Sequence, residues 1–529
     1  MVESLEARGY GVGMPGYDRE KWGFDLDGEN KAKGLILWKL QSPHVRAFHL
    51  SWTSFFTSFV AAFAMAALLP VVRQNLDLTA ADIGASGIAN VVGAIGARVI
   101  IGAICDTVGP RYGVAGVLLL IAPSVFCASL IVDRGGIIAV RFFMGIGICI
   151  FVCNQFWSGT MFSPNCVGTV NATCGGWGNL GGGVTQLIMP LIYSGIKQSG
   201  RPGFTAWRWS FMVPGAMFLL LAMMTLLFAQ DTPNGSYRDL RKTRAAQIDG
   251  KKTLLAALKN YRTWVLTLNY GYCFGVELTI NSIIVSYFFD QFGLTLEIAG
   301  IVGAVFGLMN LFCRSAGGLA SDLGGKYFGM RGRLWAYFIL QLCAGALSIV
   351  LGNVDDTLGG TIAVMIVFSA FVQSAEGACY GVVPFVSRRS YGVVAGMVGA
   401  GGNTGSAVTQ ALFFADNPGL KMSTQDGLVW MGVMIMAVTC TLCSLHWPAW
   451  GGMLTPANPN ATEEDYYLSD WDPEEVAANL HIPSLRFAME SKSMRGKANY
   501  AKYMAENSVK EGSEDSDVVI AKDIKTDSQ

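Results

Sequence analysis

Twelve apolar stretches, each long enough to cross a lipid bilayer, constrain this chain more than any other feature. They fall near residues 48–72, 82–105, 112–132, 136–160, 168–195, 207–229, 263–290, 295–320, 333–352, 359–380, 392–414 and 426–450. A bilayer core about 30 Å thick needs roughly 20 apolar residues per helix. Hydrophobic residues make up 52% of the chain and charged residues only 14%, which excludes an ordinary soluble domain. We therefore expect an all-α polytopic membrane protein with twelve transmembrane helices.

Polar segments divide the chain into five parts. We expect an N-terminal tail at 1–47, a six-helix bundle at 48–229, a linker at 230–262, a second six-helix bundle at 263–450 and a C-terminal tail at 451–529. The last segment is rich in Glu, Asp, Lys and Ser, which is typical of a largely disordered chain. Lys and Arg concentrate in the linker and in the other segments on its side of the membrane, so both termini are expected to be cytoplasmic.

The two halves repeat a pattern of residues. In each half an Asp follows the second span, with a Gly four residues before it, a Gly three residues after it and an Arg eight residues before it. The fifth span of each half carries an Asn seven residues before a Gln, and in both halves this Gln ends the sequence "VTQ". The matched residues are Arg98, Asp106, Asn179 and Gln186 in the first half, and Arg314, Asp322, Asn403 and Gln410 in the second. Parallel repeats of this kind are typical of two-bundle transporters.

Two glycine-rich stretches, "GGWGNLGGGVTQ" at 175–186 and "GAGGNTGSAVTQ" at 399–410, lie inside apolar spans. Each interior Gly costs a helix about 0.5–1 kcal/mol relative to Ala, so these positions need a compensating reason. Small residues let helices approach closely. We interpret the stretches as faces that slide against neighbouring helices and bring one amide each, Asn179 and Asn403, to a cavity. Helix packing alone is the alternative, and it explains the glycines but not the matched amides.

Arg98 and Arg314 are expected to lie deep in the membrane. Each stands eight residues, about 12 Å along a helix, inside the end of its span. A charged side chain at that depth costs at least about 2.5 kcal/mol, and two facing cations would also repel each other. A small planar anion between them would remove both problems, because a guanidinium presents paired donors in one plane. The alternative is that each Arg pairs with a carbonyl or a carboxylate from another span.

The loop after the second span resembles a motif of the major facilitator superfamily, Gly-x-x-x-Asp-x-x-Gly-x-Arg. The motif residues are Gly102, Asp106, Gly109 and Arg111. In the second copy Gly318, Asp322 and Gly325 fit, but the basic residue comes later, at Arg331 or Arg333. The resemblance implies the two-bundle fold of this superfamily, and it implies that these residues form a gating latch and do not contact the substrate.

The glycine stretches resemble the paired nitrate signatures of the nitrate/nitrite porter family. "FTAWR", "KYFGMRGRLW" and "PFVSRR" resemble the high-affinity nitrate transporters of plants and algae, over about residues 44–450. This resemblance implies a plasma-membrane secondary transporter that takes up nitrate, and nitrite as a further substrate, by proton symport with alternating access. It also implies a single-span accessory protein as partner. Three alternatives stay open: nitrate/nitrite exchange, a non-transporting nitrate receptor that signals through its tail, and transport of another small anion.

The resemblance and the residue pattern together define the expected sites. The expected substrate contacts are Arg98, Arg314, Asn179, Asn403, Tyr270, Phe274, Phe151, Gly175 and Gly399. Glu277 and Glu376 lie inside spans and are the candidates for proton coupling, with Glu277 preferred because it follows Tyr270 by two helical turns on about the same face. A neutral buried Glu or a structural ion pair is the alternative for either carboxyl group.

Other classes of function find no support in the sequence. No phosphate-binding GxxxxGK[ST] loop and no catalytic constellation is present, so we expect neither ATP-driven transport nor an enzyme. The twelve Cys residues match no zinc spacing. We accordingly expect no metal, no cofactor and no nucleic-acid partner.

Overall fold

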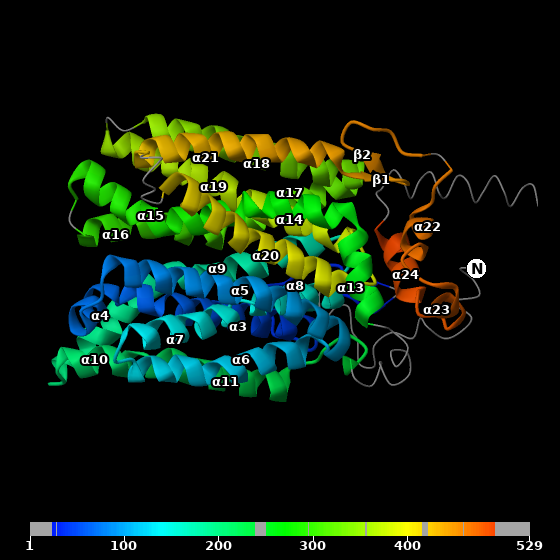
Figure 1. The fold of residues 1–529 in the computed structure, drawn as a ribbon. Coiled ribbons are helices and arrows are strands. Elements are labelled where there is room, and N and C mark those ends of the chain that lie inside the picture. The colour runs from blue at the N-terminus through cyan, green and yellow to red at the C-terminus, as the bar shows by residue number, and fades with distance from the viewer. Residues whose placement is uncertain are drawn as a thin grey trace, which may run out of the picture.

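The computed structural model describes residues 24–27, 29–237, 250–294, 296–354, 357–414, 422–458 and 460–491. Two bundles of long helices lie side by side, the first blue to green and the second green to orange (Figure 1). The first bundle contains α3 (His44–Ala67), α4 (Leu69–Leu76), α5 (Ala80–Val108), α6 (Pro110–Cys127), η1 (Ala128–Leu130), α7 (Arg134–Gly147), α8 (Ile150–Met161), α9 (Val167–Gln198), α10 (Gly203–Ser210) and α11 (Met212–Phe228).

The second bundle repeats this arrangement. It contains α14 (Tyr261–Gly271), α15 (Phe274–Phe292), α16 (Leu296–Leu308), η3 (Met309–Leu311), α17 (Cys313–Phe328), α18 (Met330–Asn353), α19 (Leu358–Val382), η4 (Val383–Phe385), α20 (Tyr391–Thr409), the π-helical turn η5 (Gln410–Phe414), α21 (Thr424–Thr439) and η6 (Cys440–Ser444). The bundles meet where α5 packs on α20 and where α9 packs on α17 and α19. The all-α polytopic fold expected from the apolar stretches is confirmed.

Nine helices of the described chain are long and apolar enough to cross a membrane. They coincide with nine of the twelve expected stretches. The other three, 168–195, 263–290 and 392–414, are also helical, as α9, as α14 with α15, and as α20. These are the segments that carry the glycine-rich faces and the Tyr270 region, so low apolarity coincides with the expected binding residues.

Several site helices are interrupted rather than continuous. The chain leaves helical geometry between α14 and α15, at Tyr272 and Cys273, and a 3₁₀ turn at Met309–Leu311 separates α16 from α17. Between α7 and α8, Ile148 and Cys149 keep helical dihedral angles, but their N–H groups donate three residues back, to Gly145 and Ile146, in a tightened turn. Interruptions of this kind near the middle of a span let side chains and backbone groups turn toward an internal cavity.

One end of the molecule carries a folded cap. It comprises α13 (Gly250–Lys259), β1 (His446–Trp447), β2 (Gly451–Gly452), α22 (Glu463–Leu468), α23 (Pro473–Ala477) and α24 (Ile482–Glu490), all gathered at the same end of the bundles (Figure 1). β1 and β2 pair antiparallel, with His446 opposite Gly452. The N-terminal segment joins the first bundle at this end, because the Ala32 N–H donates to the Met161 carbonyl and the Ser163 N–H donates to the Ala32 carbonyl.

Part of the tail that the sequence predicts to be disordered is therefore folded. Arg389 forms two hydrogen bonds of 2.6 and 2.7 Å to the buried carboxylate of Glu475. The Tyr466 hydroxyl donates to the Val386 carbonyl at 2.5 Å, and Ser387 donates to Asp470 at 2.8 Å. These contacts hold residues 460–491 against the second bundle, whereas residues 492–529 lie outside the described chain.

Candidate functional site

Arg98 and Arg314 come from different bundles and meet at the same pair of aromatic rings. Both side chains are buried, Arg98 on α5 and Arg314 on α17. The Arg98 guanidinium carbon lies 5.4 Å from the centre of the Phe151 ring and 5.2 Å from that of Phe274. The corresponding distances for Arg314 are 5.6 and 5.9 Å. The fold thus brings together four residues that the sequence predicts as substrate contacts.

An aromatic cluster lines this meeting point. The Phe151 and Phe274 rings are nearly parallel, with centres 6.4 Å apart, and Tyr270 stacks on Phe274 at 5.3 Å. Tyr380, which the sequence analysis missed, meets Phe151 edge-on at 4.9 Å and Tyr270 at 5.0 Å. The sequence did offer one signal for Tyr380: it stands one helical turn after Glu376, on the same face of the helix as that candidate residue. A guanidinium beside aromatic faces is stabilised without a fixed counter-charge, so it remains able to bind an anion.

Arg314 pairs with a carboxylate from another helix. Its Nη1 group donates to Glu376 on α19, and its Nη2 group donates to the Tyr270 hydroxyl at 2.6 Å. The carboxylate of Glu277 on α15 lies 4.0 Å from the same Nη1 atom. The sequence-based alternative of a pair with a carboxylate from another span is the arrangement that the structure has for Arg314.

Arg98 has a different environment. Its Nη1 group donates to the main-chain carbonyl of Gly399 on α20. Its Nε and Nη2 atoms, and the Nε atom of Arg314, are buried and have no hydrogen-bond partner among the described residues. Because an unpaired buried donor costs free energy, these three atoms are where an anion would gain most from binding.

The carboxylate of Glu277 is held by two amides. The Asn179 side-chain N–H donates to it at 3.2 Å and that of Asn310 at 2.7 Å. Asn310 was not among the predicted residues, because it lies in the turn η3 and has no counterpart in the repeat pattern. Asn403, the partner of Asn179 in the repeat, is buried on α20 and makes no side-chain hydrogen bond to a described group.

The glycine-rich faces are the surfaces on which the charged and aromatic side chains lie. A Cβ atom added at Gly175 would stand 2.9 Å from the Nε atom of Arg314, and one added at Gly399 would stand 3.4 Å from Cδ of Arg98. Any side chain at Gly178 would overlap the ring of Phe55, and one at Gly402 would overlap that of Phe274. Each face therefore supports one arginine and one aromatic ring, in matching positions of the two halves.

The motif residues connect the two bundles near the folded cap. Asp106 accepts hydrogen bonds of 3.0 Å from the main-chain N–H groups of Gly392 and Val393, at the start of α20. Anions bind well at a helix N-terminus, where N–H groups are free and the helix dipole is positive. Gly102 faces the Gly392 carbonyl so closely that a Cβ atom there would overlap it.

The second motif copy makes the reciprocal contact at the start of α9. Asp322 accepts from the N–H groups of Gly168 at 3.1 Å and Thr169 at 2.6 Å, and Gly318 faces the Gly168 carbonyl. The displaced basic residue is Arg333, which donates to Asp322 at 2.7 Å.

In the first copy, Arg111 instead donates through its main-chain N–H to Asp231 at 3.0 Å and through Nη2 to the Leu226 carbonyl. Gly109 has a φ of +95°, which favours glycine at the turn between α5 and α6. The contacts of Asp106 with α20 and of Asp322 with α9 each join one bundle to the other, as a latch would.

Comparisons with known proteins identify the family of this chain. The model of the Major Facilitator Superfamily matches residues 50–410. Nitrate transporter 2.1 of Chlamydomonas reinhardtii is 53% identical over 90% of this chain and 88% of its own length. High affinity nitrate transporter 2.5 of Arabidopsis thaliana is 49% identical over 90% of this chain and 95% of its own length.

Solved structures show the same fold at much lower identity. The E. coli fucose:proton symporter FucP superposes with a TM-score of 0.56 at 13% identity, over 75% of this chain and 98% of that one. The proton:xylose symporter XylE reaches 0.57 at 14% identity, over 76% and 96%. The chain is thus a membrane transporter and not an enzyme. It belongs to the Major Facilitator Superfamily and, within it, to the family of the plant and algal high-affinity nitrate transporters.

Proposed function

We propose that this protein takes up nitrate, with nitrite as a further substrate, by proton symport. One observation carries the anion part of the proposal: Arg98 and Arg314 face the same two rings and present three unpaired donor nitrogens. Nitrate is a planar monoanion with three acceptor oxygens, which suits donors held in two guanidinium planes. The names of the two closely related transporters support the choice of nitrate over another small anion.

Proton coupling would act through the carboxyl groups beside Arg314. Glu376 accepts a hydrogen bond from the Nη1 group of Arg314, so this donor is not free for a bound anion. Protonating Glu376 weakens its pairing with the guanidinium and frees that donor, so a proton and an anion would enter together. This contact favours Glu376 over Glu277, which the sequence pattern preferred, because Glu277 lies 4.0 Å away and accepts hydrogen bonds from two amides.

Symport also meets the energetic requirement of uptake. Moving one negative charge into a cell costs about 2.3 kcal/mol per 100 mV of inside-negative potential. Each tenfold accumulation adds about 1.4 kcal/mol. Two or more protons per nitrate would make the net charge movement positive, and therefore favourable.

The remaining features of the proposal concern the cell. We propose a plasma-membrane location with both termini cytoplasmic, which places the folded cap and the two Asp latches on the cytoplasmic side. In alternating access, the latches would hold this side closed and would open to release nitrate inside. A single-span accessory protein is the proposed partner.

Uptake into proteoliposomes tests the proposal. An imposed inward proton gradient should drive nitrate accumulation, with and without a co-reconstituted accessory protein. Accumulation that depends on internal nitrite but not on pH would replace symport with exchange. Absence of nitrate counterflow in protein that binds nitrate would favour a receptor.

A further inference from the structure

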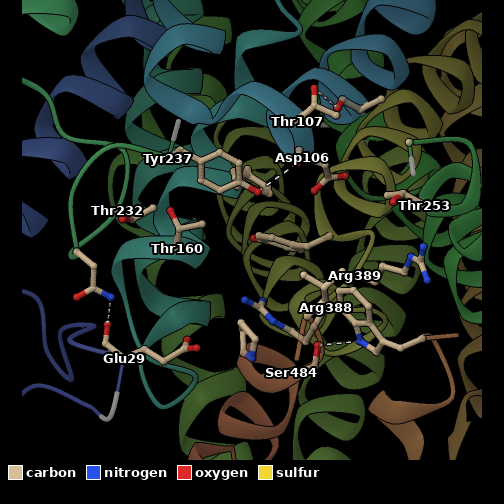
Figure 2. A pocket seen from close by; sticks show the side chains of 18 of the residues that line it. Glu29, Asp106, Thr107, Thr160, Thr232, Tyr237, Thr253, Arg388, Arg389 and Ser484 are labelled. Carbon is tan, nitrogen blue, oxygen red and sulfur yellow. Dashed lines mark hydrogen bonds between the residues drawn. The ribbon is translucent and has the colours of Figure 1, made fainter. Parts of the chain in front are cut away.

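A cavity that is separate from the arginine site lies between the two bundles and the folded cap. Its volume is about 420 Å³. Figure 2 shows Asp106, Tyr237, Arg388 and Ser484 around the same space. Asp106 stands eight residues, about 12 Å along α5, from Arg98. The cavity is therefore distinct from the proposed nitrate site, and its size is that of a site for a small organic molecule.

Most of the charged groups of this cavity are already paired. Glu29 forms an ion pair with Lys31 at 2.5 Å, and Arg389 pairs with Glu475. Asp106 accepts the two main-chain N–H groups at the start of α20.

Arg388 is the exception among the charged side chains that the structure describes here. Its Nη1 atom is buried and has no hydrogen-bond partner within the described residues. Its guanidinium lies on the rings of Phe487, at 4.2 Å, and Tyr391, at 5.4 Å. Burial alone would raise the pKa of Glu29, but the positive charges of Lys31, Arg388 and Arg486 hold it below its ordinary value.

Aromatic rings form much of the cavity wall between these charged groups. Phe156 stacks on Tyr391 with ring centres 5.7 Å apart, and Tyr237 meets Phe156 at 6.3 Å. Trp471 lines the cap side, where its indole N–H donates to Ser484 at 3.3 Å. Such walls suit a flat apolar group, and the unpaired Arg388 nitrogen suits one acid group.

We propose that this cavity binds an organic anion with one acid group and an apolar, ring-sized body. The acid group binds Arg388, and the body lies between Phe156, Tyr391 and Trp471. The occupant contacts α5 and α8 of one bundle, the 388–391 segment of the other, and the cap. It therefore stabilises the state in which Asp106 is latched to α20, and it slows nitrate uptake from the cytoplasmic side.

Binding to the purified full-length protein tests the site without any transport. Phenylacetate is the probe, phenylacetamide is its uncharged control, and vesicles of phosphatidylglycerol or phosphatidylcholine present lipid head groups. Phenylacetate should raise the unfolding temperature in a saturable way, and phenylacetamide should not.

Arg388→Gln should weaken binding about 10–100-fold, since a charge-assisted hydrogen bond is lost. Arg331→Gln is the matched control, because Arg331 contacts the Gly452 and Thr455 carbonyls of the cap without lining the cavity.

Each outcome decides a part of the proposal. An effect of phosphatidylglycerol alone, lost in Arg388→Gln, would assign the acid group to a lipid and keep the site. Equal stabilisation of Arg388→Gln and the parent by every probe would overturn it. If Arg388→Gln does not fold, Thr160→Phe fills the cavity while keeping the charge, and unchanged binding in that variant would also overturn it.

The effect on transport needs a separate measurement and rests on the proposed function. Phenylacetate inside proteoliposomes should lower the maximal nitrate uptake rate with little change in KM. A binding site confirmed by unfolding, with uptake unaffected, would remove the regulatory step alone.

Discussion

The two bundles hold their arginines in matching positions but in opposite surroundings. Arg98 has one carbonyl partner and no carboxylate within the described chain, whereas Arg314 contacts Glu376 and lies near Glu277. The repeat shows where this difference arises. Glu376 stands 23 residues before Gly399, and the residue 23 before Gly175 is the apolar Val152.

The second carboxyl group, that of Glu277, also has no acidic counterpart in the first bundle. Glu277 comes three residues after Phe274, whose ring packs on Gly402. In the first bundle, Ser58 comes three residues after Phe55, whose ring packs on Gly178, and its hydroxyl donates to the Gly147 carbonyl at 2.7 Å. The glycines, the arginines and the rings of Phe55 and Phe274 are thus duplicated, and the acids are not. In the proposed symport, anion binding would therefore use both bundles and proton coupling would use the second one.

Removing each arginine is expected to give the largest effects, and the two effects should differ in size because the two arginines have different partners. Arg314→Gln leaves Glu376 and Glu277 without their cation, which should lower the free energy of unfolding by about 3–5 kcal/mol. Arg98→Gln loses only a hydrogen bond to a carbonyl, at a cost of about 1.5–3 kcal/mol. Unfolding of the purified variants measures both values.

A double variant provides the control for this prediction. Arg314→Gln with Glu376→Gln removes the uncompensated carboxylate and should be more stable than Arg314→Gln alone. Equal losses for the two single arginine variants would contradict the asymmetry.

Lysine at either position should affect nitrate more than folding. Arg98→Lys and Arg314→Lys keep the charge but lose the planar pair of donors. We expect the KM for nitrate to rise at least about tenfold, as for the loss of one charge-assisted hydrogen bond. If both variants transport with unchanged KM, the anion binds elsewhere.

Bulky residues on the glycine-rich faces should stop transport in both bundles alike. Gly178→Leu would force Leu against Phe55, and Gly402→Leu would force it against Phe274. Overpacking of this kind costs about 1–3 kcal/mol, so surface expression should survive while uptake is lost. Gly195→Leu, also on α9, is the matched control, because a Cβ atom there meets nothing within 4 Å. Normal uptake by Gly402→Leu would exclude a need for close packing at this face.

Neutral variants of Glu376 and Glu277 distinguish the roles of these two acids in the second bundle. Glu376→Gln cannot form the ion pair with Arg314, so we expect nitrate-for-nitrate exchange to persist while pH-driven accumulation falls at least about tenfold, the equivalent of 1.4 kcal/mol. Glu277→Gln should lose less, because its carboxylate does not touch the guanidinium directly. Measurement of exchange and driven uptake in the same vesicles separates the two effects. The reverse order would return the coupling role to Glu277.

Changes in the cap should have the smallest effect on nitrate binding. Truncation after Asp470 removes α23 and α24 but no residue of the arginine site, so KM should stay within about twofold, less than one lost hydrogen bond of about 0.5–1.5 kcal/mol would produce. The tail serines Ser508, Ser513 and Ser516 stand among mixed charges, which makes them candidates for phosphorylation, and they lie outside the described residues. A tenfold rise in KM after truncation would contradict the separation of cap and site.

Within the cap, two ion pairs allow a further test. Glu475→Gln leaves the buried Arg389 without its carboxylate, and should destabilise the cap more than Asp472→Asn. Asp472 pairs with Lys252 at 2.6 Å, but both side chains are about half exposed, and solvent screens such pairs. Proteolysis of the cap in the two variants measures the difference.

The spans, the repeat and the paired residues could be read from the sequence because they depend on local spacing. Hydropathy over some 20 residues predicts a membrane helix, and equal offsets in two halves predict equal positions in two bundles. Arg98, Arg314, Phe151, Tyr270 and Phe274 were predicted as one site, and the fold places them together.

The tertiary structure alone decided which groups pair. Glu376 meets Arg314 across 62 residues of chain, and Glu475 meets Arg389 across 86. Asn310 holds Glu277 from a turn that no periodic pattern marks. Such contacts depend on how separate helices pack and on the free-energy cost of leaving a buried charge unpaired. They therefore have no signature in the residue spacing of one segment. For the same reason a polar tail that reads as solvated chain folds at residues 460–491, where buried groups of the second bundle bind it.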